Sequence, residues 1–247
     1  MSQSTLSGSI EQMRRWLAEP GNNPLRAVGV VLDRGFRYAG RKLAGARPFD
    51  LGGERFTHLV HPFILDNERT VEIPLALRLV ERRPGARILE VGNVLAAYRR
   101  FEHTVVDKYE KATGVINADI VEYRPDRPFD LILCLSTLEH VGWDETPRDD
   151  AKIGLALAAM AAMLAPGGEL LVTLPLGYNA NLDRLLDADA LPFTELRFLK
   201  RISADNRWVE ATWPEVRGSK FGTPFGCANA LAVGRVRAPA AGQGVGA

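Results

Sequence analysis

The sequence predicts an α/β fold with a doubly wound, mainly parallel sheet, to which the C-terminal part of the chain adds antiparallel strands. The first observation is the apolar run Arg87–Val91, which follows the break at Pro84-Gly85, is too short for a helix and ends at Gly92. The second is that further short apolar runs alternate with helical patterns as far as Pro175. A strand that turns at a glycine toward a helix opens such a sheet, and ligands bind at the carboxyl ends of its strands.

Residues 1–50 predict a basic, helical N-terminal extension. One helix is expected over Ile10–Ala18, and a second over Leu25–Leu43. Residues 12–47 hold eight Arg or Lys against two acidic residues, which gives this segment a net charge of +6. Because the apolar positions lie opposite the arginines, we expect the segment to pack on the main domain with a solvated basic face. The alternative is weak peripheral contact with an anionic membrane surface or with an acidic partner.

Residues 48–65 are broken by proline and glycine, and the sequence predicts a loop there. In the charged segment that follows, Asp66 or Asn67 can cap a helix that continues to about Arg83, with Pro74 bending it or marking its start. Since this segment directly precedes the first strand, we expect it to fold over the ligand end of the sheet.

The later strands of the parallel sheet are predicted from apolar runs, of which Phe129–Leu135 is the strongest. The others are Val105-Val106, Gly114–Asn117 and Glu169–Leu174, with a helix over Lys152–Leu164 before the last of them.

The pattern changes after Pro175, where turn residues separate short runs that suit antiparallel strands. A helix is expected over Asp183–Leu191, followed by strands at Arg197–Ile202, Arg207–Trp213 and Asn229–Val236. We expect residues 51–237 to form the main domain and residues 238–247, which are almost all Ala, Gly and Pro, to be a disordered tail.

The composition limits the class of protein. The 247 residues are 46% hydrophobic and 25% charged, as in an ordinary globular protein, and the net charge of +1 gives no reason to expect a nucleic-acid partner. Two cysteines make no disulfide framework. The sequence shows neither the apolar core of a signal peptide nor an apolar run of about 18 residues that would span a membrane, so we expect a cytoplasmic protein.

A carboxylate lies at or directly after each of the first three predicted strands. Asp107 can accept hydrogen bonds from both hydroxyls of a ribose, and Asp119 can accept one from an adenine amino group while Ile120 packs on the ring. Glu90 suits a cation such as a sulfonium. A dinucleotide is disfavoured, because its fingerprint needs a second glycine where this chain has Val94.

The motifs that carry a family resemblance run in order through residues 84–180. They are Ile88-Leu-Glu-Val-Gly92, Asp107, Ala118-Asp-Ile120, Phe129-Asp-Leu-Ile-Leu133, Ser136-Thr-Leu-Glu-His-Val141 and Leu164-Ala-Pro-Gly-Gly-Glu-Leu-Leu-Val-Thr173. Together they resemble the class I S-adenosylmethionine-dependent methyltransferases, which have a Rossmann-like fold. The glycine loop departs from the family pattern at Val94. The strings Asp66–Arg69, Val141–Glu145 and Leu174–Tyr178 resemble a bacterial subgroup associated with saccharide, cell-surface or secondary-metabolite pathways.

The resemblance implies S-adenosylmethionine as the cofactor and assigns residues to each part of it. Glu90, Gly92 and Asn93, in the first motif and its loop, would hold the methionine end. Asp107 would hold the ribose, and Asp119 and Ile120 would hold the adenine. Ser136, the residue after the fourth strand, would hold the methionine amino group.

His140 is the expected base for a hydroxyl acceptor, because imidazoles titrate near neutral pH and this one follows the fourth strand. The alternative is that it only makes structural hydrogen bonds. The acceptor-pocket candidates are Glu68, Trp143, Asp144 and Tyr178. No metal is expected, since the spacing of the histidines matches no strong ligand pattern.

These assignments predict a methyltransferase for a small-molecule or saccharide-type acceptor, with O-methylation expected. Two alternatives remain. One is a non-catalytic module that binds S-adenosylmethionine, and the other is a nicotinamide-dependent enzyme that modifies sugars.

Overall fold

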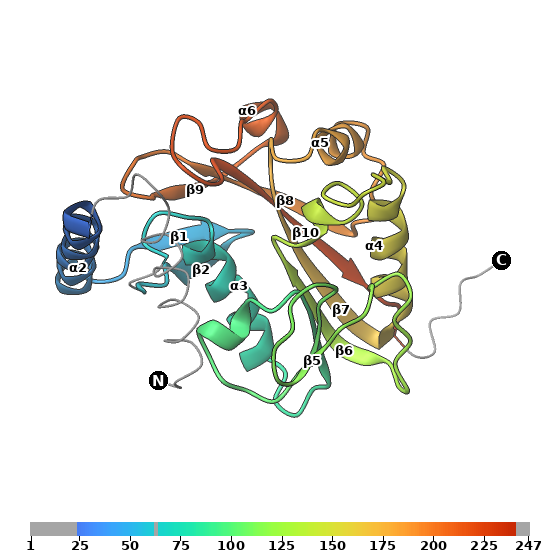
Figure 1. Ribbon diagram of the computed structural model, residues 1–247. Coiled ribbons are helices and arrows are strands. Elements are labelled where there is room, and N and C mark those ends of the chain that lie inside the picture. Colours follow the sequence, from blue (N-terminus) through green and yellow to red (C-terminus); the bar gives the residue numbers. More distant parts are fainter. Residues whose placement is uncertain (1–23, 62–63, 241–247) are drawn as a thin grey trace. The chain divides into compact units, whose positions relative to one another are not determined.

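The computed structural model describes residues 24–61 and 64–240 (Figure 1). These residues divide into two compact units, one of residues 24–46 with part of 60–65, and one of residues 47–59 and 66–240. The first unit holds helix α2 (Pro24–Ala44), close to the predicted bounds. The predicted helix over residues 10–18 and the tail beyond residue 240 lie outside the described residues. None of the described helices is long and apolar enough to cross a membrane.

The second unit is built on an eight-stranded sheet with the order β5-β4-β3-β6-β7-β10-β8-β9. The pairs from β5 to β7 are parallel, and those from β7 to β9 through β10 and β8 are antiparallel. The predicted fold class is therefore confirmed. The strands are β3 (Ile88–Val91), β4 (Thr104–Val106), β5 (Val115–Ile116), β6 (Phe129–Leu135), β7 (Leu164–Pro175), β8 (Glu195–Arg201), β9 (Trp208–Ala211) and β10 (Ala230–Arg237).

Strand β6 is apolar on both faces because each face of the sheet carries its own core. Leu131 and Leu133 pack with helix α3 (Arg69–Glu81), whereas Ile132 and Cys134 pack with helix α4 (Lys152–Ala162). All four side chains are fully buried. Burial of one such side chain contributes about 1.5–3 kcal/mol, which explains the strength of the strand pattern in the sequence.

The order of the strands places a switch point beside β3. The chain goes from β3 to β4 and β5 on one side and then crosses back to β6 on the other side of β3. The carboxyl ends of β3, β4 and β6 therefore meet at one edge, where a crevice opens in folds of this kind.

The prediction of a loop over residues 48–65 is wrong for its first half. The chain forms an antiparallel hairpin of β1 (Pro48–Leu51) and β2 (Glu54–Thr57). Gly52 and Gly53 both have positive φ, at 63° and 76°. A two-residue hairpin turn needs this conformation, so the two glycines make the hairpin rather than break it.

Helix α3 begins later than predicted and contains Pro74. Glu68, rather than Asp66 or Asn67, is its N-cap residue, with αR backbone angles and no side-chain cap hydrogen bond. Pro74 has no N–H to donate to the carbonyl of Thr70, four residues earlier. That carbonyl instead accepts a hydrogen bond of 2.9 Å from the backbone N–H of Leu59, so the proline leaves no carbonyl without a partner.

Further boundaries also differ from the predictions. The turn after Gly92 opens onto only one 3-10 turn, η1 (Leu95–Ala97), because the chain must begin β4 a few residues later. Strand β7 starts at Leu164 rather than Glu169 and its pairing with β6 shifts register near its start. Helix α5 (Ala180–Asp187) begins earlier than predicted, since the Asn179 side chain accepts hydrogen bonds from the first-turn N–H groups.

Candidate functional site

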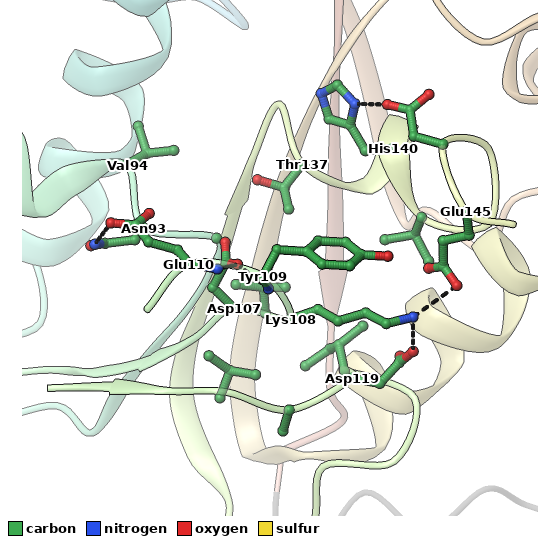
Figure 2. A pocket seen from close by; sticks show the side chains of 17 residues that line it. Asn93, Val94, Asp107, Lys108, Tyr109, Glu110, Asp119, Thr137, His140 and Glu145 are labelled. Carbon is green, nitrogen blue, oxygen red and sulfur yellow. Dashed lines mark hydrogen bonds and ion pairs between the residues drawn. The ribbon is translucent and has the colours of Figure 1, made fainter. Parts of the chain in front are cut away.

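A cavity of about 580 Å³ opens at the carboxyl ends of β3, β4 and β6 (Figure 2). This volume lies within the range of roughly 300–1,000 Å³ typical of small-molecule sites. Its walls come from the loops after these three strands and after β5. The lining residues are Val91, Gly92, Asn93, Val94, Val106, Asp107, Lys108, Tyr109, Glu110, Ala118, Asp119, Ile120, Thr137, His140, Val141, Asp144 and Glu145.

Gly92 lets the loop after β3 approach the loop after β6. Its φ is +85°, and a Cβ built there would lie 2.4 Å from Oγ1 of Thr137. Its N–H donates to the carbonyl of Val106 at 2.9 Å, which ties the turn to β4. A side chain at this position would push the two walls of the cavity apart.

Glu90 braces the glycine loop and does not line the cavity. Its side chain is fully buried, and Oε1 accepts hydrogen bonds from the N–H groups of Val94 and Leu95 at 2.8 and 2.7 Å. Oε2 lies 2.7 Å from Nε2 of His103. Burial opposes the charged form of His103, but the hydrogen bonds with Glu90 and with the carbonyl of Phe101, together with the charge of Glu90, outweigh burial and raise the pKa of the imidazole. Glu90 therefore holds the loop in place and does not itself face the cavity, where the sequence predicted that it would support a bound cation.

Among the residues that the structure describes, one carboxylate oxygen of Asp107 has no hydrogen-bond partner and is available to a ligand. Oδ1 accepts hydrogen bonds from the N–H groups of Tyr109 and Glu110 at 2.8 and 2.7 Å, which fixes the turn after β4. Such a turn holds the carboxylate at the cavity wall with a defined orientation. Figure 2 shows Lys108 and Tyr109 extending from this turn toward Glu145.

Asn93 carries a buried acceptor without a partner among the described residues. Its Nδ2 donates to Oε1 of Glu110 at 2.8 Å, and its Oδ1 accepts no hydrogen bond. Buried polar atoms are rarely left unpaired in folded proteins. An orphaned oxygen in a cavity wall is therefore a place where a ligand donor fits.

Asp119 is already paired with two cations. Lys108 lies 3.0 Å from its Oδ2, and Lys152 donates to the same oxygen. Both lysines also bind Glu145, at 2.8 and 2.6 Å. Burial opposes ionisation of Asp119, yet the two lysines lower its pKa to about 2. The carboxylate expected to accept from an adenine amino group thus shares its oxygens with the lysines and with the N–H of Val121.

His140 and Asp144 form a hydrogen-bonded pair at the mouth of the cavity. Nδ1 of His140 lies 2.6 Å from Oδ2 of Asp144, which also accepts from the hydroxyl of Tyr178 at 2.8 Å. Burial opposes the charge on Asp144, but these two hydrogen bonds lower its pKa. Burial and Asp144 raise the pKa of Tyr178 to about 12, so the phenol stays protonated.

Behind the cavity wall, Glu72 joins α3 to the ends of two strands. Its Oε1 accepts from the hydroxyls of Ser136 and Thr173, each at 2.5 Å, and its Oε2 accepts from Arg69 at 2.9 Å. Arg69 also donates to the carbonyl of Leu135 at the end of β6. Ser136 has a φ of 39°, in the left-handed region, and this network holds it there.

Glu139 is a second buried carboxyl of the same region, with 2% of its surface exposed. Its Oε2 has no hydrogen-bond partner among the described residues, and its Oε1 lies 3.7 Å from Nε2 of His140. Burial raises the pKa of Glu139 well above its ordinary value of 4.5, and the charge of Glu72 adds to the increase.

The substitution Glu139→Gln is expected to stabilise the protein increasingly as the pH rises. Above pH 4.5 the unfolded chain releases a proton that folded Glu139 retains, so the wild-type free energy of unfolding falls until the folded pKa is reached. Glutamine has no such proton. The difference between urea midpoints of variant and wild type should therefore grow from pH 5 to pH 8. A difference that is independent of pH would mean that Glu139 titrates normally.

The cavity brings together seven of the twelve residues predicted for the site: Gly92, Asn93, Asp107, Asp119, Ile120, His140 and Asp144. Tyr178 touches the cavity wall through Asp144. The remaining four do not line it: Glu90 and Ser136 bind neighbouring protein groups, Glu68 accepts from the N–H of Ala228, and Trp143 stacks under Arg148.

Sequence reasoning did not assign Lys108, Tyr109, Thr137 or Glu145 to the site. Lys108, Thr137 and Glu145 directly follow the assigned residues Asp107, Ser136 and Asp144, and Tyr109 lies two positions after Asp107. That adjacency was the available signal.

The fold and the cavity define an α/β protein with a ligand site at the carboxyl ends of its parallel strands. No protein-family model matches the sequence, and no curated protein matches it. Among solved structures, the N-methyltransferase NodS from Bradyrhizobium japonicum WM9, in complex with S-adenosyl-L-homocysteine, is 20% identical with a TM-score of 0.45. That match covers 72% of this chain and 92% of NodS.

Two further solved structures are similar over comparable lengths. CalS10, an amino pentose methyltransferase from Micromonospora echinaspora, is 18% identical with a TM-score of 0.35, and the match covers 67% of this chain and 90% of that one. A possible histamine N-methyltransferase from Thermotoga maritima is 16% identical with a TM-score of 0.39, covering 64% and 85%. Identities and TM-scores this low assign neither a family nor a function to this chain.

Proposed function

We propose that the chain is an S-adenosylmethionine-dependent methyltransferase that acts on a small-molecule or saccharide-type acceptor. The observation that carries the proposal is the charge of the cavity. Five carboxylates line it: Asp107, Glu110, Asp119, Asp144 and Glu145. Two ammonium groups oppose them, that of Lys108 in the lining and that of Lys152, which pairs with Asp119 and Glu145 from outside it, so carboxylates exceed ammonium groups by three. A wall with this excess of negative charge favours a ligand with a sulfonium and an ammonium group and disfavours a diphosphate.

The residues present fit this cofactor at three points. The free oxygen of Asp107 suits ribose hydroxyls, and the orphaned Oδ1 of Asn93 suits a donor such as an ammonium or hydroxyl. Ile120 is a buried apolar neighbour for a purine ring. Val94 lines the cavity where a diphosphate would need bare backbone, which counts against a nicotinamide cofactor.

When bound, the cofactor supplies an electrophilic methyl group for in-line displacement by the acceptor. In the proposed mechanism the chain positions the two reactants and removes a proton. With Nδ1 donating to Asp144, Nε2 of His140 is left as a proton acceptor at the cavity mouth, and O-methylation is the reaction that needs it. Asp144 fixes this tautomer and stabilises the imidazolium. Tyr178 holds Asp144 in place as a hydrogen-bond donor.

Asp107→Ala is expected to weaken S-adenosylmethionine binding by about 1–3 kcal/mol, because a charged hydrogen-bond acceptor is lost. Asp107→Asn is the matched variant. Its side-chain oxygen can still accept from Tyr109 and Glu110 and keep the turn, while its amide replaces the acceptor that faces the ligand. Both variants should show the loss by titration calorimetry with S-adenosylmethionine and S-adenosylhomocysteine.

The control is Asp50→Ala, an exposed aspartate of β1 outside the cavity, which should bind as the wild type does. NAD should give no heat with any of these proteins. Unchanged affinity in folded Asp107 variants would remove Asp107 from the site. Binding of NAD in preference to S-adenosylmethionine would overturn the proposed function, and binding without turnover on any acceptor would favour a non-catalytic module.

A further inference from the structure

Helix α2 presents an exposed apolar stripe. Leu32, Phe36 and Leu43 are 55%, 76% and 90% exposed. At 3.6 residues per turn these three side chains fall within an arc of about 40° on the helix surface. Large apolar side chains that share one exposed face mark an interaction surface.

The positive charge of the chain is concentrated on the same helix. The α2 sequence holds five Arg or Lys against one acidic residue, a net charge of +4, whereas the whole chain carries +1. The rest of the chain is therefore −3. No acidic residue lies in the first turn of α2, and Arg41 and Lys42 lie in its last turn.

Two basic side chains of α2, those of Arg37 and Lys42, lie off the stripe. Arg37 pairs with Asp33 one turn earlier at 3.8 Å, and Lys42 lies 5.9 Å from the centre of the Tyr38 ring. Both cations remain near the helix surface, where they can also reach anionic groups beside the apolar face. A narrow apolar stripe with cations on the remaining surface and low average hydrophobicity is the pattern of a helix that lies in a membrane interface.

We propose that α2 binds the surface of an anionic lipid membrane, with the stripe of Leu32, Phe36 and Leu43 at the acyl boundary and its cations on the headgroup phosphates. The positive charge of α2 favours an anionic membrane over a second copy of the chain. A second copy of the chain would bring two helices of +4 together, whereas an anionic lipid surface attracts each of them. This inference rests on α2 alone and is independent of the proposed methyl transfer.

The test is co-sedimentation of the full-length chain with vesicles of phosphatidylcholine alone or with added phosphatidylserine. Wild type should sediment with the anionic vesicles at physiological salt, and high salt should weaken binding. Phe36→Ser/Leu43→Ser should lower the partition coefficient about a hundredfold. Arg37→Gln/Lys42→Gln should lower it about twenty-fivefold, at roughly fivefold for each cation removed.

The matched control is Leu155→Ser/Ile202→Ser, which removes two apolar side chains that are 52% and 45% exposed outside α2. It should bind vesicles as the wild type does. Absence of binding, equal binding to neutral vesicles, or binding that survives both α2 variants would overturn the proposal. So would a dimer in size-exclusion chromatography that is lost with the stripe variant, because the occupant would then be a second copy.

Discussion

His140→Ala is expected to lower the rate of methyl transfer to a hydroxyl acceptor by about 10²–10⁴-fold, the usual contribution of a positioned general base. S-adenosylmethionine affinity should change little, because the imidazole lies at the mouth of the cavity with Asp144 as its hydrogen-bond partner. The measurement is transfer of labelled methyl to whichever small molecule or saccharide supports turnover by the wild type, together with calorimetry for the cofactor.

Asp144→Asn is the companion variant, since it keeps the shape of the side chain but removes the charge that orients His140. Its rate should fall with a changed pH profile while cofactor affinity stays normal. Equal losses of cofactor binding and turnover in both variants would place the pair on the cofactor side. A rate that His140→Ala leaves unchanged would mean that the acceptor atom needs no base, as for an amine that arrives uncharged.

The sequence was sufficient to predict the central strands and the residues that directly follow them. Phe129–Leu135 is apolar at nearly every position because both faces of β6 are buried, and a residue that follows a parallel strand reaches the same edge as its neighbours. Gly92 and Asp107 were predicted for the site in this way, and both line the cavity. The hairpin of residues 48–57 was missed because Gly52-Gly53 is a break in one context and a tight turn in another.

Residues predicted for the site that do not line the cavity have a different physical reason. Glu90 lies inside β3, between Leu89 and Val91, whose side chains lie on the α4 side of the sheet. Side chains alternate along a strand, so Glu90 points to the opposite face and braces the loop from behind. The contacts of Glu72 could not be predicted for another reason, because they join residues that lie 64 and 101 positions apart in the chain. No local pattern records such pairs.

Because Glu72 makes these long-range contacts, we expect Glu72→Ala to cause the largest loss of stability. The free energy of unfolding should fall by about 3–5 kcal/mol, as it does when one partner of a buried ion pair is removed. The substitution leaves Arg69 without its carboxylate and the hydroxyls of Ser136 and Thr173 without their shared acceptor. Glu72→Gln should cost less, since an amide oxygen still accepts from one side. Glu139→Gln is the matched control, a buried glutamate of the same region that should not destabilise at neutral pH. Urea midpoints at pH 7 measure all three. If Glu72→Ala and Glu139→Gln shift the midpoint equally, the network does not hold the end of β6 in place.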